Sequence, residues 1–181
     1  MRTLEVRRHA MRRKPGEHLS QDGVALARRV GSISGPFRLV VTSPSPRAFE
    51  TAIAMGFAVD ETLDALGELG DDVFGEVGWP VPFARIAQAV ALGRHSRGFA
   101  EAQARLWRSI VERVPDAGQA LIVTHGLFVE LGAVASVPEA DPAAWGDAIA
   151  YCEGVRLRFD GGAFRDCEVL RVPQEYRLIQ N

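Results

Sequence analysis

Cysteine is scarce in this chain of 181 residues, which contains only Cys152 and Cys167. Two thiols are too few for a disulfide framework, and their separation is not that of paired metal ligands. A disulfide-stapled secreted domain and a small zinc module are therefore not expected. The same scarcity favours a reducing compartment, and we expect the protein in the cytoplasm.

Long hydrophobic runs and an excess of charge of one sign are also absent. No apolar run reaches the roughly 18 residues of a membrane span, and no signal-peptide core precedes the first predicted strand. The formal net charge is −2, so no overall positive field favours nucleic acid or an anionic membrane surface. We expect a protein that is not exported and that binds neither a membrane nor nucleic acid.

Linkers, internal repeats and low-complexity tracts are missing as well, and residues 1–181 are expected to form a single domain. A domain of this size buries roughly 70% of the surface that its unfolded chain exposes, which is enough for a core without disulfides or metals.

What the sequence does contain is an alternation of strand and helix patterns. Strands are predicted over residues 3–7, 38–42 and 120–124 and within 57–63, and helices over 21–32, 46–55, 82–114 (broken near Gly93 and Gly98) and 127–135. The helix at 21–32 has Ser20 as its expected N-cap. Residues 67–81 show little periodicity and receive no assignment.

The strand patterns indicate how the sheet is built. Residues 38–42 and 120–124 are continuously apolar, which is typical of parallel strands that are covered on both faces. Residues 154–159 and 163–172 flank Asp160-Gly161-Gly162, a hairpin signal that would add antiparallel strands at an edge. The predicted fold class is therefore α/β, with a mostly parallel sheet, helices on both faces and an antiparallel edge.

Arginine or histidine stands beyond the end of three predicted strands. Arg8 and His9 end the first, Arg47 follows the loop after the second, and His125 follows residues 120–124. Ligands of open α/β sheets bind at the carboxyl ends of the strands, so these side chains are expected to converge on one small anion. A phosphoryl group is the anion that such a set suits best.

The residue types fit phosphoryl transfer. A histidine nucleophile needs one unprotonated ring nitrogen and positive groups around the phosphoryl oxygens, which His9 and Arg8 provide. Arg47 lies in the first turn of a predicted helix, where backbone amides also favour an anion, and its planar fork can bind two oxygens. His125 can donate a further hydrogen bond. Any one of these residues alone is more often a solvated or capping residue, and it is their joint occurrence that favours a phosphate site.

These motifs resemble the histidine phosphatase superfamily, the phosphoglycerate-mutase-like group. The matching segments are Val6-Arg7-Arg8-His9-Ala10 (the Arg-His-Gly/Ala signature), Leu19–Gly23 (a Leu-Thr-x-x-Gly-like element), Ser43–Ala52 (Ser-Pro-x-x-Arg-Ala-x-x-Thr-Ala) and Val123-Thr124-His125-Gly126 (the second histidine motif). They occur in the right order between residues 4 and 126, and the Ser43–Ala52 block is the most specific.

The resemblance implies a phosphoglycerate-mutase-like fold and a metal-independent phosphatase without a cofactor. His9 would be the nucleophile that becomes phosphorylated, and Arg8, Arg47 and His125 would form the phosphate pocket. The Arg-His-Ala form and the short middle segment, residues 57–118, look more like the small phosphatases, so the substrate would be a phosphorylated small molecule or a phosphoprotein, including phosphohistidine. A phosphate-binding module with little turnover and a mutase-type phosphotransferase stay open as alternatives.

Two segments depart from the family pattern. Leu66-Gly67-Glu68 fits the Leu-x-Glu segment whose glutamate donates a proton to the leaving group, but the residues after it do not, so Asp71, Asp72 and Glu76 stay as rivals of Glu68. Arg12-Arg13-Lys14 stands where many members carry Glu and Asn. It is either a solvated basic loop or a site for additional negative charge on the substrate.

Overall fold

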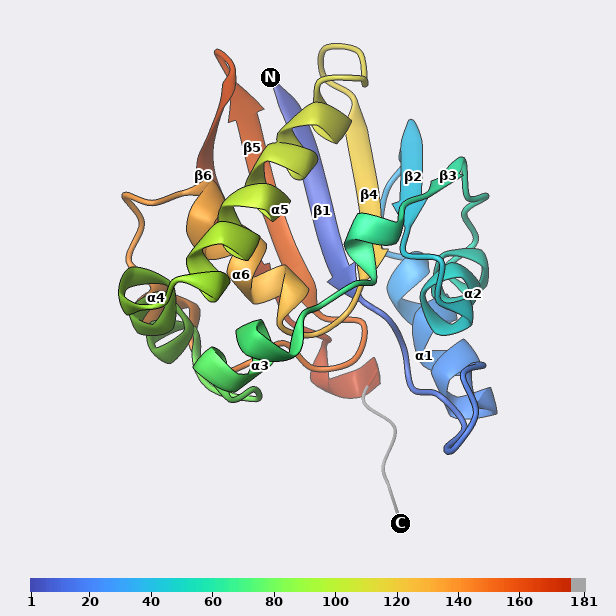
Figure 1. Ribbon diagram of the computed structural model, residues 1–181. Coiled ribbons are helices and arrows are strands. Elements are labelled where there is room, and N and C mark those ends of the chain that lie inside the picture. The colour runs from blue at the N-terminus through green and yellow to red at the C-terminus, as the bar shows by residue number, and fades with distance from the viewer. Residues whose placement is uncertain (177–181) are drawn as a thin grey trace.

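One mixed sheet with the strand order β3-β2-β4-β1-β5-β6 runs through the computed structural model, which describes residues 1–176 (Figure 1). The strands are β1 (Arg2–Arg8), β2 (Leu39–Thr42), β3 (Glu61–Thr62), β4 (Gln119–Thr124), β5 (Gly154–Asp160) and β6 (Ala163–Leu170).

Strand directions follow the sequence pattern. β1 pairs in parallel with β4, from Thr3 opposite Gln119 to Arg8 opposite Thr124, and β4 continues in parallel to β2 and β3. β5 runs antiparallel to β1, and the hairpin partner β6 forms the antiparallel edge. The predicted α/β fold with a mostly parallel sheet and an antiparallel edge is confirmed.

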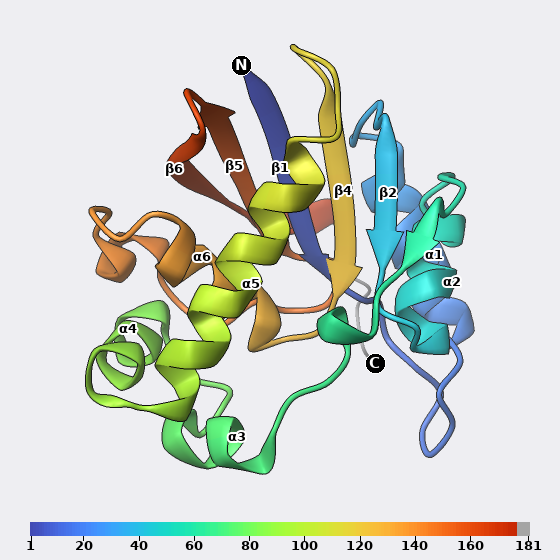
Figure 2. The same ribbon diagram turned by 45° about the horizontal axis from the view of Figure 1, so that its top comes forward.

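Helices cover both faces of this sheet. They are α1 (Gln21–Gly31), α2 (Pro46–Ala54), α3 (Asp71–Val77), α4 (Phe83–Leu92), α5 (His95–Val111) and α6 (Phe128–Ser136). Figures 1 and 2 show α1 and α2 on one face and α5 and α6 on the other, with α3 and α4 beside the latter pair. Among residues 1–176, no helix combines the length and the apolar character needed to cross a membrane.

A hydrophobic core lies against each face of the sheet. Ile122 of β4 packs with Trp107 of α5 on one face of the sheet, while its neighbours Leu121 and Val123 pack with α1 and α2 on the other. A strand that is buried on both sides cannot alternate polar and apolar residues, which explains the continuous apolar run at β4.

Local signals were accurate at several boundaries and wrong at one. Ser20 caps α1, since its Oγ accepts a hydrogen bond from the Gly23 amide at 3.0 Å. The break expected near Gly93 is present between α4 and α5, but the break near Gly98 is not, because α5 continues through that residue. Gly98 is exposed with open space around it, so the helix tolerates it at a small cost. The strand expected within 57–63 has only two residues, Glu61 and Thr62, and the unassigned stretch contains α3.

Candidate active site

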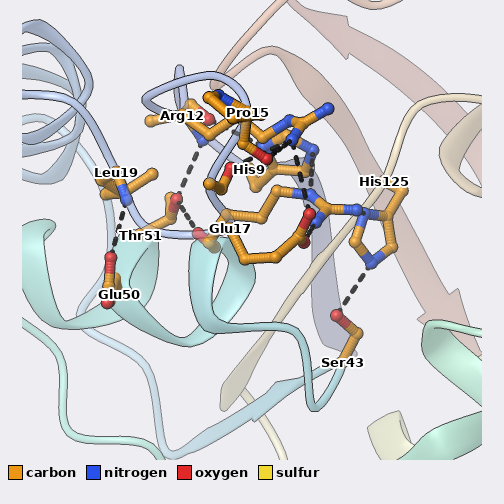
Figure 3. A network of polar contacts seen from close by, with 12 residues as sticks. His9, Arg12, Pro15, Glu17, Leu19, Ser43, Glu50, Thr51 and His125 are labelled. Atoms are coloured by element: carbon orange, nitrogen blue, oxygen red, sulfur yellow. Dashed lines mark hydrogen bonds and ion pairs between the residues drawn. The ribbon is translucent and has the colours of Figure 1, made fainter.

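The carboxyl ends of three neighbouring strands bring the candidate residues together. His9 follows β1, Ser43 follows β2 and His125 follows β4, and backbone hydrogen bonds from His9 to Thr124 (2.9 Å) and from Ser43 to Val123 (3.1 Å) extend the ladder to these positions. The His9 and His125 rings have centroids 5.2 Å apart. In Figure 3, His9, Glu17 and His125 gather at one place and Ser43 reaches His125 from below. The expected convergence of His9 and His125 is present.

His9 is held as a neutral ring with a defined tautomer. Its Nδ1 lies 2.7 Å from the Ala10 carbonyl oxygen, which can only accept, so Nδ1 carries the proton. Its Nε2 accepts a hydrogen bond from Arg47 Nε at 3.1 Å. His9 is 7% exposed. Burial lowers the pKa of His9 to about 3, and the positive charges of Arg47 and Arg8 act in the same direction. The Nε2 lone pair therefore faces the cationic side of the site.

Arg47 lies in the first turn of α2 and joins the two histidines. Besides the bond to His9, its Nη2 lies 3.4 Å from His125 Nδ1. The turn is tied to the backbone beyond His9 through Thr51, whose Oγ1 donates to the Arg47 carbonyl (2.7 Å) and accepts from the Ala10 amide (2.9 Å). Thr51, the threonine of the Ser43–Ala52 block, thereby links α2 to the backbone at the end of β1.

His125 has the opposite tautomer. Because Nδ1 faces a guanidinium donor, the proton lies on Nε2, which donates to Ser43 Oγ at 2.9 Å. Burial, together with the charges of Arg47 and Arg8, lowers the pKa of His125 to about 4. The free Nδ1 is thus directed at Arg47, where it would gain a proton when an anion arrives.

Arg8 lies beside this pair under two aromatic rings. Its Nη1 donates to the Ile149 carbonyl at 3.0 Å, and its guanidinium carbon is 4.1 Å from the Tyr151 ring centroid and 4.9 Å from that of Trp79. Burial lowers the pKa of Arg8. Its charge acts on both histidines, so it belongs to the same electrostatic site, although it makes no hydrogen bond to either ring.

The loop between β1 and α1 brings in an acidic residue. Arg12 Nη1 donates to the carbonyls of Pro15 (3.3 Å) and Gly16 (2.9 Å) and to Glu17 Oε1 (3.4 Å), while the other oxygen of Glu17 is bound by Arg47 Nη1. Arg12 is thus half-buried within the loop, whereas Arg13 and Lys14 are exposed.

This loop is anchored to α2 by Glu50. The Glu50 carboxylate accepts from the Leu19 amide at 2.8 Å and contacts His18 Nδ1 (Figure 3). The loop carboxylate of Glu17 is therefore held over Arg47 by contacts at both ends of the loop.

The candidate proton donors are placed very differently. Glu68 is exposed and follows Gly67, at which an added Cβ would lie 3.3 Å from Ser43 Cβ, so its backbone borders the site. Glu76 instead accepts from the backbone amides of His95 (3.1 Å) and Ser96 (2.8 Å) at the start of α5. Hydrogen bonds from Ser96 lower the pKa of Glu76 to about 2, so it is a helix cap without a proton to give.

The two remaining rivals open α3. Asp71 and Asp72 are exposed in its first turn, and Asp72 lies 3.9 Å from His95 Nδ1. In the part of the chain that the structure describes, neither carboxylate forms a hydrogen bond or an ion pair with His9, Arg47 or His125. Glu68 is the member of the original set whose neighbours touch the site.

Sequence reasoning did not identify several residues that complete the site. The motifs give Ser43 and Thr51 no role of their own and do not predict that Glu17 or Tyr151 joins the site, and Trp79 is expected only as an apolar neighbour that could desolvate the proton donor. The first two carry a signal, since a buried hydroxyl within a phosphate-loop motif invites a search for its partner. The other three stand in irregular segments, and their proximity to His9 and Arg8 depends on how those segments fold back.

Among residues 1–176, no group of three or more His, Cys, Asp or Glu side chains could hold a metal ion. Cys152 and Cys167 are free thiols, and burial raises the pKa of each to about 12.

Comparison with known proteins gives a match in structure but not in sequence. No family model and no curated protein matches the sequence significantly. A phosphoserine phosphatase from Entamoeba histolytica, solved with 3-phosphoglyceric acid, aligns over 98% of this chain and 100% of its own with a TM-score of 0.71 and 15% identity. A phosphoglycerate mutase from Bacillus anthracis aligns over 96% and 94% with a TM-score of 0.64 and 19% identity. A mycobacterial glucosyl-3-phosphoglycerate phosphatase in complex with VO₃ aligns over 96% and 100% with a TM-score of 0.64 and 21% identity.

At these identities the likeness establishes the fold. The chain has the fold of phosphoglycerate mutase and of these phosphatases over nearly its whole length, as its motifs predicted.

Proposed function

We propose that this protein is a phosphatase of the histidine phosphatase type, which hydrolyses a phosphomonoester or phosphohistidine through a phosphohistidine intermediate on His9. The observation that carries the proposal is the state of His9. Its Nδ1 proton is held by the Ala10 carbonyl, and its Nε2 lone pair faces Arg47 in a site that also contains His125. The phosphatases among the structural neighbours support the same reaction class.

In the first step, the Nε2 lone pair of His9 forms a bond to phosphorus while the bond from phosphorus to the leaving oxygen breaks. The Arg47 guanidinium turns from Nε2 to the phosphoryl oxygens, and Arg8 and His125 bind the remaining negative charge. His125 takes up a proton on Nδ1 as the anion raises its pKa, so it binds as a donor.

The leaving oxygen receives its proton from Glu68 in this proposal. In the second step, the Glu68 carboxylate takes a proton from water, which attacks phosphorus. The bond from phosphorus to Nε2 breaks, His9 recovers its lone pair and inorganic phosphate leaves. Because burial lowers the pKa of His9 to about 3, the nucleophile stays unprotonated in mild acid. This supports the assignment as a histidine-type acid phosphatase.

The substrate is proposed to be a phosphorylated small molecule or a phosphoprotein. The first is supported by the neighbours, whose names give phosphoserine and glucosyl-3-phosphoglycerate as substrates. The second is supported by the exposure of Glu68, the proposed proton donor. We propose a cytoplasmic location, with the free thiols Cys152 and Cys167 in support.

The experiment that tests the function is a screen of phosphomonoesters, sugar phosphates and phosphohistidine peptides, with wild type beside His9→Ala. We expect the wild type to hydrolyse substrate and to take up an acid-labile phosphoryl group from a radiolabelled substrate. We expect His9→Ala to lose both properties while keeping its circular dichroism spectrum. Turnover by His9→Ala near the wild-type rate would refute the assignment. A burst of leaving group without turnover would identify a phosphate-binding module instead.

The role of Glu68 has its own test. Glu68→Gln should slow the hydrolysis of an alkyl phosphate far more than that of p-nitrophenyl phosphate, because a weakly basic leaving group hardly needs a proton. Glu17→Gln serves as the matched variant, since Glu17 is the carboxylate that Arg47 binds. If Glu17→Gln shows the leaving-group dependence and Glu68→Gln does not, Glu17 is the donor and the Glu68 assignment is wrong.

A further inference from the structure

A carboxylate that phosphoryl transfer does not use lies fully buried behind the site. Glu130 of α6 is 0% exposed and accepts hydrogen bonds from the Leu127 amide (2.6 Å), the Ile149 amide (2.9 Å) and the Trp79 indole (3.0 Å). The donors come from three separate segments: the turn before α6, the chain between α3 and α4, and the loop before β5. Burial raises the pKa of Glu130, and these three donors oppose that rise. A buried carboxylate with three donors is costly to lose, because each donor would remain unpaired.

Two of the three segments hold Arg8. The Ile149 carbonyl accepts from Arg8 Nη1 at 3.0 Å, and the Trp79 ring lies 4.9 Å from the Arg8 guanidinium. Ile149 therefore binds Glu130 through its amide and Arg8 through its carbonyl, and Trp79 binds Glu130 through its indole N–H and Arg8 through its ring. The direction of the Arg8 guanidinium depends on where Glu130 fixes these two residues.

The third segment is the turn that follows His125. Leu127 has φ of 71°, a left-handed backbone that a leucine rarely adopts, and its amide makes the 2.6 Å bond to Glu130. At Gly126 an added Cβ would lie 2.3 Å from Trp79 Cζ2, so the indole rests directly on this turn. The same carboxylate thus stabilises a strained turn beside one phosphate-binding residue and the aromatic ring above another.

We propose that Glu130 is a positioning residue for the phosphate site, fixing Arg8 through Trp79 and Ile149 and the turn after His125 through Leu127. The proposal rests on the proposed function for its kinetic consequence. Glu130 itself touches neither substrate nor His9. Its effect is to hold the donors where the phosphoryl charge develops, because small displacements of these donors lower the rate strongly.

A double-mutant cycle tests the action through Arg8. Trp79 and Ile149 donate to one oxygen of Glu130 and Leu127 donates to the other. Gln at position 130 keeps the volume but replaces one of these oxygens with an N–H₂, which leaves at least one donor unpaired, so Glu130→Gln should lower kcat/KM by about tenfold or more. In an Arg8→Ala background the same change should lower kcat/KM by a clearly smaller factor, because one of the two groups that Glu130 positions is gone. Equal losses in both backgrounds would refute the proposal.

Trp79→Phe covers the case in which Glu130→Gln does not fold. It removes the indole N–H while keeping a ring over Gly126 and Arg8, and Trp79 is only half-buried. We expect Trp79→Phe to lower kcat/KM severalfold with Arg8 present and to have little effect with Arg8→Ala. An unchanged kcat/KM in Trp79→Phe would show that the hydrogen bond to Glu130 positions nothing.

A readout without turnover separates this proposal from the proposed function. The indole N–H resonance of Trp79 is assigned as the one that Trp79→Phe removes from the ¹H–¹⁵N spectrum. In Glu130→Gln it should move upfield and exchange faster with water. If wild type is inactive and this resonance moves, the proposed function fails while the link from Glu130 to Trp79 stands. If the resonance does not move, the positioning role is refuted whatever the activity.

Glu5→Gln is the matched control. Glu5 of β1 is also 0% exposed and is bound by Arg7 and Arg156, away from Trp79 and Ile149. We expect Glu5→Gln to lower the urea midpoint as Glu130→Gln does, but to leave kcat/KM within about twofold, since general destabilisation does not move donors at the site. A loss of kcat/KM equal to that of Glu130→Gln would attribute both effects to stability and overturn the proposal.

Discussion

At the scale of single residues, the site depends on two histidines in opposite tautomers. His9 keeps its proton on Nδ1 because the Ala10 carbonyl accepts it, and His125 keeps its proton on Nε2 because Ser43 accepts it. Both remaining ring nitrogens accept from Arg47. One guanidinium therefore contacts the acceptor nitrogen of both rings, and in the proposed mechanism a phosphoryl group that binds Arg47 changes both contacts at once.

The pH dependence of these rings is the first prediction. Burial lowers the pKa of His9 to about 3 and that of His125 to about 4, against an ordinary value of 6.5. The ring resonances of His9 and His125 are assigned as those that His9→Asn and His125→Asn remove from the NMR spectrum. In titrations of the free protein, we expect both to titrate below about pH 4.5.

The same shifts have a consequence for stability, with a definite sign. The unfolded chain binds protons at these histidines near pH 6.5 and the folded chain does not, so the free energy of unfolding should fall as pH falls from 6.5 toward 3. Urea denaturation of wild type and His9→Asn at pH 7 and 5 measures this. A ring midpoint near 6.5, or a stability difference that does not change with pH, would contradict it.

At the scale of elements, glycines mark where helices pack and where they do not. Gly132 lies in α6 against Trp107 of α5, and an added Cβ there would lie 2.2 Å from the Trp107 ring. Gly98 lies in α5 with nothing within 4 Å. The close approach of α5 and α6 thus needs a residue without a side chain at one helix position, while the other glycine serves no packing role.

The two glycines therefore predict opposite effects of the same substitution. Gly98→Ala should raise the free energy of unfolding by about 0.5–1 kcal/mol, because alanine loses less backbone entropy in a helix. Gly132→Ala should lower it by about 1–3 kcal/mol, because Trp107 has no room to move. Urea unfolding of both variants against wild type measures this. A Gly132→Ala protein as stable as Gly98→Ala would mean that α5 and α6 are not packed this closely.

At the scale of the whole molecule, the positive site stands in a chain of net charge −2. Arg8 and Arg47 lie together because strands β1 and β2, separated by β4, end at the same edge of the sheet. Carboxylates elsewhere neutralise other arginines locally, as Glu5 does between Arg7 and Arg156. The positive charge at this edge of the sheet is therefore a local property, as the overall charge required.

Metal independence is the prediction at this scale. Turnover should be unchanged after dialysis against EDTA, because the guanidinium groups of Arg8 and Arg47 and the first turn of α2 supply the charge that a divalent ion would otherwise bring. Steady-state kinetics before and after chelation measure it. Complete loss of activity in EDTA that one divalent ion restores would overturn the account of the site.

The sequence by itself determined the layers and the main site residues. Continuous apolar strands at β2 and β4, the Ser20 cap and the Asp160-Gly161-Gly162 turn are local patterns, and local patterns suffice to place elements. Parallel strands of one sheet have their carboxyl ends at a common edge. The local patterns therefore also sufficed to predict that His9, Arg47 and His125 lie together.

Only the tertiary structure decided what surrounds those residues. Glu17, Trp79, Tyr151 and Glu130 come from irregular segments or from a helix face that reads as ordinary surface, and no periodicity relates them to Arg8 or Arg47. The same holds for Glu76, whose use as a cap of α5 depends on α3 folding back against it. Such contacts depend on long-range packing, which the spacing of residues along the chain does not encode.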